Sequence, residues 1–264
     1  MEQITSTQNV KFKRWKKCLT TKGRKEHQSF LVEGIHMVQE ALLHQQQIEG
    51  ILLEEGRSLP QELDLLLQGQ ELMVLASSLF QQLAQTVHSQ GIIAVIKAPE
   101  LPRMEELISD ADQGQLHILV DGVQDPGNLG TIIRTADAVG ATSVLLGKGC
   151  VDPYNDKVLR ATMGSIFHLP ILQIDLLQMI PHLKQAEIQV IAAMLGATEL
   201  HTNFGWKKQT AIVVGNEGNG VRPEVEALVD KRLSIPMYGA AESLNVAVAT
   251  ALLMYEWRRH YSIK

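Results

Sequence analysis

The sequence predicts an α/β protein with two parts, a small N-terminal α/β sandwich and a C-terminal, mostly parallel sheet with helices on both faces. In the second half, four short runs are apolar on both faces and alternate with helical segments. This is typical of parallel strands buried between helices. A stretch rich in proline and acidic residues, 98–106, separates these runs from the first half. At 264 residues the chain has room for two domains.

The first half alternates between short strands and helices, with domain bounds predicted at 1–97 and a linker at 98–114. The expected strands are Phe30–Val32, Ile51–Leu53 and Gly91–Lys97, and the expected helices are 34–44 and 77–87. The short elements and their alternation predict a small α/β sandwich.

The second half, 115–264, carries the predicted parallel sheet. Its expected strands are Leu116–Val120, Ser143–Leu146, Gln189–Ala193 and Ala211–Val214, and its expected helices lie near 130–139, near 156–163 and from about Leu244 onward. Ligands of such sheets bind beyond the carboxyl ends of the strands. The segments that follow these strands are therefore where we expect a site.

Basic residues are concentrated at the N-terminus. Eight Lys and Arg residues lie in the first 25 positions, opposed only by Glu2, and the rest of the chain has 16 basic against 28 acidic residues. This asymmetry is expected of a protein that meets a polyanion with one face. A solvated basic helix is the equally weighted alternative. The candidate contacts are Lys11, Lys13, Arg14, Lys16, Lys17 and Arg24.

The number and spacing of cysteines, and the lengths of the apolar stretches, restrict the class of protein. Cys18 and Cys150 are isolated, which favours a reducing cytosol and disfavours a disulfide framework or a Cys-based zinc site. The nine His residues show no clustered ligand spacing, so no metal site is expected. No signal peptide and no membrane-spanning apolar stretch are recognisable, so we expect a cytoplasmic protein without a membrane partner.

A glycine-rich loop follows the predicted strand Ala211–Val214. Gly215, Gly218 and Gly220 have the spacing G-x-x-G-x-G, the reverse of the dinucleotide fingerprint, and the loop lacks the Lys of a P-loop. Glu217 would repel a pyrophosphate, so the loop better suits a neutral adenine or ribose, or a cationic ligand. An ordinary strand-to-helix turn is the alternative.

A second candidate segment opens the last helix. Ser243 is expected to be its N-cap, because a hydroxyl can accept from the first backbone N–H groups. Asn245 is an amide among apolar neighbours and needs a hydrogen-bonding partner if it is buried. Capping alone for Ser243 and core packing alone for Leu244 are the alternatives.

Arg134 lies in a helix that follows a Gly/Asn turn, 127–130. Its apolar neighbours are expected to place it close to the sheet. An arginine is well shaped for a bidentate grip on phosphate. A solvated helical arginine is the alternative.

Together, the segments at 128–136, 211–220 and 235–245 resemble the three ordered motifs of the SpoU (TrmH-like) RNA 2′-O-ribose methyltransferases of the SPOUT superfamily. The resemblance implies S-adenosylmethionine as the cofactor and transfer of its methyl group to a ribose 2′-hydroxyl of RNA. The implied catalytic residues are Arg134, Asn128, Glu217, Ser243 and Asn245. The implied cofactor-binding residues are Leu195, Gly196, Gly215, Asn216, Glu217, Ile235, Met237, Ser243, Leu244 and Asn245.

The resemblance extends to architecture. The N-terminal half resembles an RNA substrate-binding domain of ribosomal-protein type, through the segments 4–11, 30–36 and 90–95. Membership of the family implies a C-terminal trefoil knot and a homodimer. The basic N-terminus then becomes the RNA-binding candidate.

The reaction needs a positioned hydroxyl, and a guanidinium is a poor base. We therefore expect Arg134 to clamp the adjacent phosphate and hydroxyl, with Glu217 and Asn128 orienting it. Ribosomal RNA is favoured over transfer RNA as the substrate. A non-catalytic ribosome-associated RNA-binding factor and an NAD-type oxidoreductase are the competing interpretations, the latter disfavoured by the reversed glycine spacing.

Overall fold

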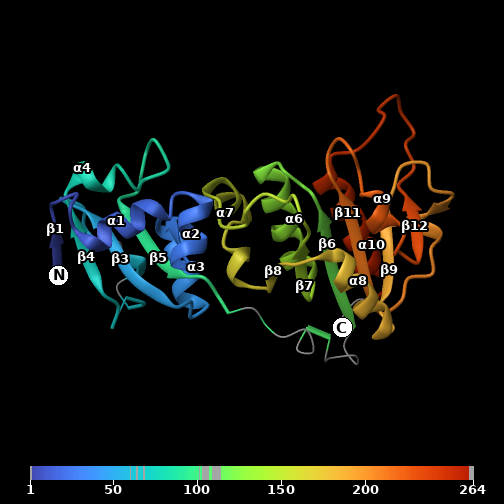
Figure 1. Cartoon of the computed structure of the whole chain (residues 1–264), viewed down its shortest axis with the longest axis horizontal. Coiled ribbons are helices and arrows are strands. Elements are labelled where there is room, and N and C mark those ends of the chain that lie inside the picture. Colours follow the sequence, from blue (N-terminus) through green and yellow to red (C-terminus); the bar gives the residue numbers. More distant parts are fainter. Residues whose placement is uncertain are drawn as a thin grey trace. The chain divides into compact units, whose positions relative to one another are not determined.

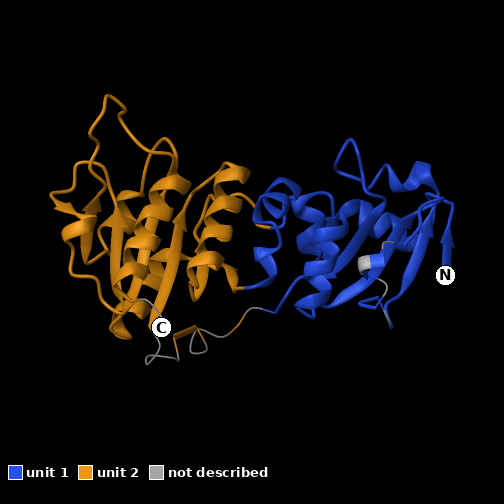
Figure 2. Cartoon of the chain, turned by 180° about the vertical axis from the view of Figure 1, so that it is seen from behind, with its two compact units in different colours: residues 1–100, 154–168 blue, residues 101–153, 169–264 orange. Residues whose placement is uncertain are grey.

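The computed structural model describes residues 2–59, 61–63, 65–67, 69–100, 102, 107–108 and 114–261. The chain divides into two compact units, residues 1–100 with 154–168, and residues 101–153 with 169–264 (Figure 2). The chain therefore leaves unit 2 after residue 153, enters unit 1, and returns at residue 169. Within the described residues, no helix is both long and apolar enough to span a bilayer.

Unit 2 is built on a seven-stranded sheet in the order β10-β12-β9-β11-β6-β7-β8 (Figure 1). All its pairings are parallel. The strands are β6 (Gln115–Asp121), β7 (Ser143–Leu146), β8 (Ile171–Gln173), β9 (Gln189–Ala193), β10 (Glu199–Leu200), β11 (Gln209–Gly215) and β12 (Lys231–Ser234).

Helices cover both faces of this sheet, as the apolar strands predicted. One face packs on α8 (Leu176–Gln185) and α9 (Pro223–Glu226), where Leu119 of β6 and Val213 of β11 join the buried cluster. Neighbouring side chains of a strand point to the opposite face. There, α10 (Val246–His260) packs on β11 and on α6 (Pro126–Val139). The sheet is thus buried between two helical layers.

Unit 1 has a mixed five-stranded sheet in the order β1-β4-β3-β5-β2. The strands are β1 (Glu2–Ile4), β2 (Ser29–Glu33), β3 (Ile48–Glu54), β4 (Leu72–Leu75) and β5 (Ile92–Lys97), and the helical elements are α1 (Val10–Lys17), α2 (Thr21–His27), α3 (Ile35–Leu43), η1 (Gln61–Leu63), α4 (Ser77–Phe80), α7 (Asp156–Thr162) and η2 (Ser165–Phe167). Phe12 and Trp15 of α1 pack with Leu31 and Val95 on one face. Phe30 points to the other face, where it stacks on Tyr154.

Two predicted helices have different bounds in the structure. The helix expected over 77–87 ends at Phe80, because the Glu33 carboxylate accepts from the backbone N–H of Gln85 and from the hydroxyl of Thr86 and so holds the chain in a turn. The helix expected from 130 starts at Pro126, because Asp125 caps it and proline suits the first helical position. The strands β1, β4, β8, β10 and β12 were not predicted.

The predicted bounds 1–97, 98–114 and 115–264 remain a prediction. Most of the predicted linker, at 101, 103–106 and 109–113, lies outside the described residues. Segment 154–168, which those bounds assign to the C-terminal domain, groups with unit 1.

Candidate functional site

The site lies where the strand order of unit 2 reverses. From β6 the chain continues outward to β7 and β8, and it then returns to the other side of β6, where β11 is the direct neighbour. The carboxyl ends of β6 and β11 therefore open the crevice in which parallel sheets bind ligands. The side-chain amide of Asn216, after β11, donates to the carbonyl of Gly122, after β6, at 2.8 Å.

The loop after β11 is a closed turn. Asn216 and Gly220 exchange two backbone hydrogen bonds of 2.9 Å. The Asn216 side-chain oxygen also accepts from the N–H groups of Gly218 and Asn219. A Cβ at Gly215 would lie 2.1 Å from the backbone carbon of Gly220, so only glycine fits there. Gly215, predicted as a cofactor contact, thus has a structural role of its own.

Glu217 ties the second motif to the first. Its carboxylate accepts from the backbone N–H groups of Gln124 and Asp125, at 3.3 and 3.2 Å, and from the side-chain amide of Asn128 at 3.0 Å. Burial acts to raise the pKa of Glu217, but the hydrogen bonds from Asn128 and from the backbone outweigh it and lower the pKa. The carboxylate stays ionised beside the N-terminus of α6, where negative charge is favoured.

Asn245 ties the third motif to the first. Its side-chain amide donates to the Asn128 side-chain oxygen at 2.8 Å. Its own oxygen caps α10 by accepting from Ala247 and Val248. The prediction that Ser243 is the N-cap is wrong, because Asn245 fills that position and Ser243 is exposed two residues before it. Glu217, Asn128 and Asn245 form one hydrogen-bonded chain across the three motifs.

Arg134 is exposed in the middle of α6 instead of lying against the sheet. No hydrogen bond or ion pair within the described residues involves its side chain. The expectation that Glu217 and Asn128 orient Arg134 is therefore wrong for this structure, since those two groups bond to each other. Arg134 remains available to an external phosphate.

An ion pair that the sequence did not reveal supports the same crevice. Asp121, at the end of β6, is fully buried, and its carboxylate accepts from the backbone N–H and the guanidinium of Arg222 at 2.8–2.9 Å. Arg222 follows the glycine loop. The signal in the sequence that could have revealed this ion pair is an acidic residue at the end of a mostly apolar strand. The pair links the end of β6 to the segment after the glycine loop, where the strand order reverses.

A model of the SpoU rRNA methylase family matches residues 115–255, and a model of an MRM3-like substrate binding domain matches residues 9–94. This chain belongs to the SpoU rRNA methylase family. It is an S-adenosylmethionine-dependent RNA 2′-O-methyltransferase, as the motif pattern implied.

Individual SpoU relatives cover the whole chain. It is 39% identical over 258 residues to the 23S rRNA (guanosine(2553)-2′-O)-methyltransferase RlmP of Bacillus subtilis, covering 98% of this chain and 100% of the relative. The AdoMet-bound rRNA methyltransferase from Sinorhizobium meliloti superposes with a TM-score of 0.86 at 28% identity, covering 100% and 99% of the two chains. AviRb from Streptomyces viridochromogenes, solved with AdoMet, gives 0.86 at 27% identity, covering 97% and 100%.

The cofactor candidates of this SpoU protein fall into two groups. Leu195 and Gly196, after β9, line a cavity of about 640 Å³, within the size range of small-molecule sites. Ile235, Met237 and Leu244 are half-buried in segment 235–245, outside that cavity's lining. Ser234 joins the two regions, since its hydroxyl donates to the carbonyl of Ala197 at 2.8 Å. The lining of the cavity combines apolar residues with charged residues of both signs, which suits a nucleoside that carries a sulfonium and an amino acid group.

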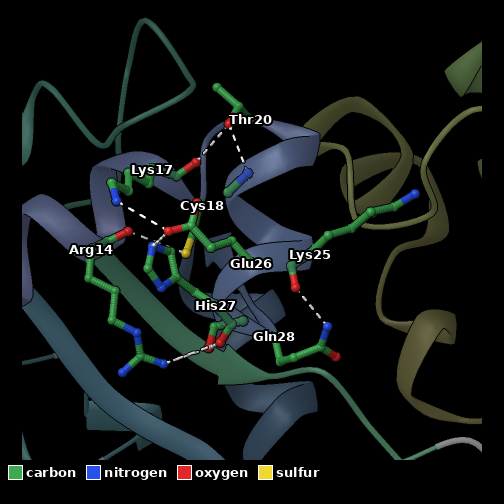
Figure 3. A network of polar contacts seen from close by, with 10 residues as sticks. Arg14, Lys17, Cys18, Thr20, Lys25, Glu26, His27 and Gln28 are labelled. Atoms are coloured by element: carbon green, nitrogen blue, oxygen red, sulfur yellow. Dashed lines mark hydrogen bonds and ion pairs between the residues drawn. The ribbon is translucent and has the colours of Figure 1, made fainter.

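The predicted RNA-binding residues of unit 1 lie on α1 and α2. Figure 3 shows two of them, Arg14 and Lys17, in their network of polar contacts. Arg24 is buried and donates to the carbonyls of Cys18 and Leu19, so its assignment as an RNA contact is corrected to a structural role. Arg14 pairs with Glu49 of β3 at 2.7 Å and donates to the carbonyl of His27, at the end of α2, at 3.5 Å.

The other basic side chains of this surface are lysines. Lys17 pairs with Glu26 at 3.3 Å, and Lys11 with two carboxylates, of Glu2 and Glu71. Among the residues that the structure describes, Lys13 and Lys16 have only glutamine partners, Gln8 and Gln82. Lys22 and Lys25 on α2 are also exposed.

The expectation of no clustered metal ligands is also corrected. Fold contacts bring Glu40, His44 and His168 together in unit 1, although His168 lies far from the other two in the sequence.

Proposed function

We propose that this SpoU protein transfers the methyl group of S-adenosylmethionine to a ribose 2′-hydroxyl of ribosomal RNA. The hydrogen-bonded chain from Glu217 through Asn128 to Asn245 carries the proposal. It joins one polar side chain from each motif, at the reversal of strand order where a ligand crevice is expected.

The three linked side chains would form one wall of the site and hold it in a fixed conformation. When bound, S-adenosylmethionine supplies a methyl group on a cationic sulfur, which makes the group open to attack by a ribose oxygen. An ionised Glu217 near that position favours a cationic ligand. Asn128 and Asn245 hold each other's amides in one orientation, so that they need little reorganisation when substrate binds.

Residues from two loops on the β11 side of the strand-order reversal would hold the cofactor. Leu195 and Gly196 come from the loop after β9, and Ile235, Met237 and Leu244 from segment 235–245. The tight turn at Gly215 and Asn216 keeps the second motif close to Gly122. Ser243 would contribute its exposed hydroxyl to the ligand instead of to the helix cap.

Arg134 would act on the RNA. Its guanidinium stays protonated and presents a planar fork of donors that matches phosphate oxygens. We assign it to gripping the phosphate next to the target ribose, which places the hydroxyl for attack. Its exposure on α6 supports this role.

A homodimer completes the proposal. Val248, Leu252 and Tyr255 of α10 follow one another at helical spacing and are 48%, 43% and 53% exposed. They line an apolar hollow of about 540 Å³ together with Thr131 of α6. Arg134 lies one turn after Thr131, so a second copy on this stripe would lie beside Arg134. The knot implied by family membership stays a prediction.

Ribosomal RNA is the proposed substrate because the B. subtilis relative is named for 23S rRNA and covers both units of this chain. The deciding experiment maps 2′-O-methyl groups in total RNA from cells with and without the gene. Loss of one ribosomal site is expected. Loss of a transfer RNA site would identify the alternative substrate, and an unchanged map with normal ribosome association would favour a non-catalytic RNA-binding factor.

A further inference from the structure

A group of metal-ligating side chains lies in unit 1, remote in sequence from the three motifs. Glu40 and His44 are one helical turn apart at the end of α3, so they share a face of that helix. His168 follows η2, 128 residues after Glu40. The potential ligand atoms of the three side chains all lie within 4.8 Å of one another.

Both imidazoles converge on one carboxylate oxygen. The Nε2 atom of His168 lies 2.9 Å from Oε2 of Glu40, and the Nε2 atom of His44 lies 3.7 Å from the same oxygen. The two rings lie side by side, with centroids 4.1 Å apart and planes tilted by 31°. Ligands at about 2.0–2.1 Å from a tetrahedral ion are roughly 3.3 Å apart, and the two distances lie on either side of that value.

Hydrogen bonding accounts for only one of these two approaches. At 2.9 Å, His168 and Glu40 are bonded, but 3.7 Å is too long for a hydrogen bond from His44. Helical i,i+4 spacing brings His44 within ion-pair distance of this oxygen. His168 reaches the same oxygen from 128 residues away, and it adds the third ligand atom that a metal site needs.

The donor set selects the kind of ion. Two imidazole nitrogens and one carboxylate oxygen suit Zn²⁺ and related divalent transition metals, whereas Mg²⁺ and Ca²⁺ prefer oxygen ligands. The side chains of Glu40 and His168 are 18% and 24% exposed, and that of His44 is 41% exposed. An ion could thus enter from solvent and keep a water as its fourth ligand.

We propose that Glu40, His44 and His168 form a Zn²⁺ site that clips segment 154–168 to α3. His36, one turn before Glu40, lies 4.0 Å from the other carboxylate oxygen, Oε1. Its Nε2 atom hydrogen-bonds the carbonyl of Met163 in the same segment at 3.1 Å. His36 would thus hold the Glu40 carboxylate in place from the side opposite the ion. The site is structural and does not depend on the proposed methyl transfer.

The test uses the full chain without a polyhistidine tag, stripped with a chelator and titrated with Zn²⁺ by calorimetry. We expect one ion per chain with a Kd at or below about 1 µM. Co²⁺ should give the visible absorption of a four-coordinate site. His168→Ala should weaken Zn²⁺ binding by at least ~10-fold, while His88→Ala, which removes an exposed histidine of the same unit, should not.

A second measurement separates a metal site from a hydrogen-bonded cluster. Zn²⁺ should raise the Tm of the wild-type chain and of His88→Ala but not that of Glu40→Gln, which keeps the shape of the side chain. Binding no tighter than ~100 µM, or equal Zn²⁺ binding by wild type and His168→Ala, would overturn the proposal. The affinity for S-adenosylmethionine is measured on the same chain before and after treatment with the chelator. It should not change, so a failure of the metal proposal can be told apart from a failure of the proposed function.

Discussion

One amide, the side chain of Asn128, connects the three motifs through both of its polar ends. It donates to Glu217 and accepts from Asn245, so its orientation is fixed without any ligand. The sequence indicated that each of these residues was functional. It could not indicate that they bond to one another, because residues 128, 217 and 245 meet only after the sheet has formed.

Arg134→Ala is expected to reduce methyl transfer by at least ~100-fold, the scale of losing a positioned group, and to leave S-adenosylmethionine affinity nearly unchanged. Arg134→Lys should restore little, because an ammonium cannot make the bidentate grip. Single-turnover methyl transfer and calorimetry measure the two effects. Arg57→Ala, which removes an exposed arginine of unit 1, serves as the control. Near-normal turnover of Arg134→Ala would contradict the assignment.

His117 makes stability depend on pH. It is fully buried in β6, its Nδ1 lies 2.9 Å from the Ser143 hydroxyl, and burial lowers its pKa to about 4 from 6.5. Because the folded chain resists protonation, the stabilisation is complete above pH 6.5 and is lost as pH falls from 6.5 toward 4. A shift of this size corresponds to about 3 kcal/mol.

Denaturant unfolding of the wild-type chain at pH 7, 5.5 and 4.5 measures this loss. The same series on His117→Asn, which keeps a polar group near Ser143 but cannot titrate, should fall less steeply between pH 6.5 and 4.5. Parallel curves for the two chains would show that His117 is not the responsible group.

At the scale of elements, apolar pattern and turn residues located the four central strands of unit 2 and its helices α6 and α10, but not α8 or α9. One error came from a side chain that acts on distant backbone, because Glu33 ends the helix after Phe80 from across the fold. The other was local, because Asn245 and not Ser243 takes the cap position of α10. The strands β8 and β12 were missed because neither shows an apolar run: β12 begins with two exposed cations, Lys231 and Arg232, and β8 has two apolar residues before an exposed Gln173.

The α1–α2 pair gives a test of RNA binding. Replacing Lys13 and Lys16 by Gln should weaken RNA binding and lower the log–log salt slope by about 1.4 to 1.8, since each lost phosphate contact contributes roughly 0.7 to 0.9. Filter binding at several salt concentrations measures the slope. The matched control replaces Lys207 and Lys208, which are exposed in unit 2 before β11. Equal slopes for both double variants would mean that α1 is only a solvated face.

At the scale of the whole molecule, the exposed stripe of α10 predicts self-association. Leu252→Lys should convert a dimer to a monomer at micromolar concentration and reduce methyl transfer, because a charge would enter the apolar contact. Leu177→Lys on α8 alters a leucine of similar exposure, 38% against 43%, and should leave the dimer intact. Analytical ultracentrifugation measures both. A monomeric wild-type chain would contradict the prediction.

The two-part organisation was predictable from composition, but the path of the chain between the parts was not. Nothing in the sequence of 154–168 distinguishes it from the helix of an ordinary parallel crossover. Val158 and Leu159 of α7 are as apolar as a helix on either unit would require. Only the formed structure shows that they are buried in unit 1.

Because segment 154–168 belongs to unit 1 but lies within the sequence of unit 2, neither unit can be expressed alone by cutting the chain at a single point. A fragment starting at residue 115 would carry 154–168 without the sheet that buries Val158, Leu159 and Ile166, and these side chains would face water. A fragment ending at residue 100 would lack Tyr154, the stacking partner of Phe30. The two units are therefore not interchangeable modules. An isolated unit 2 would need residues 154–168 replaced by a short polar bridge, and an isolated unit 1 would need them appended.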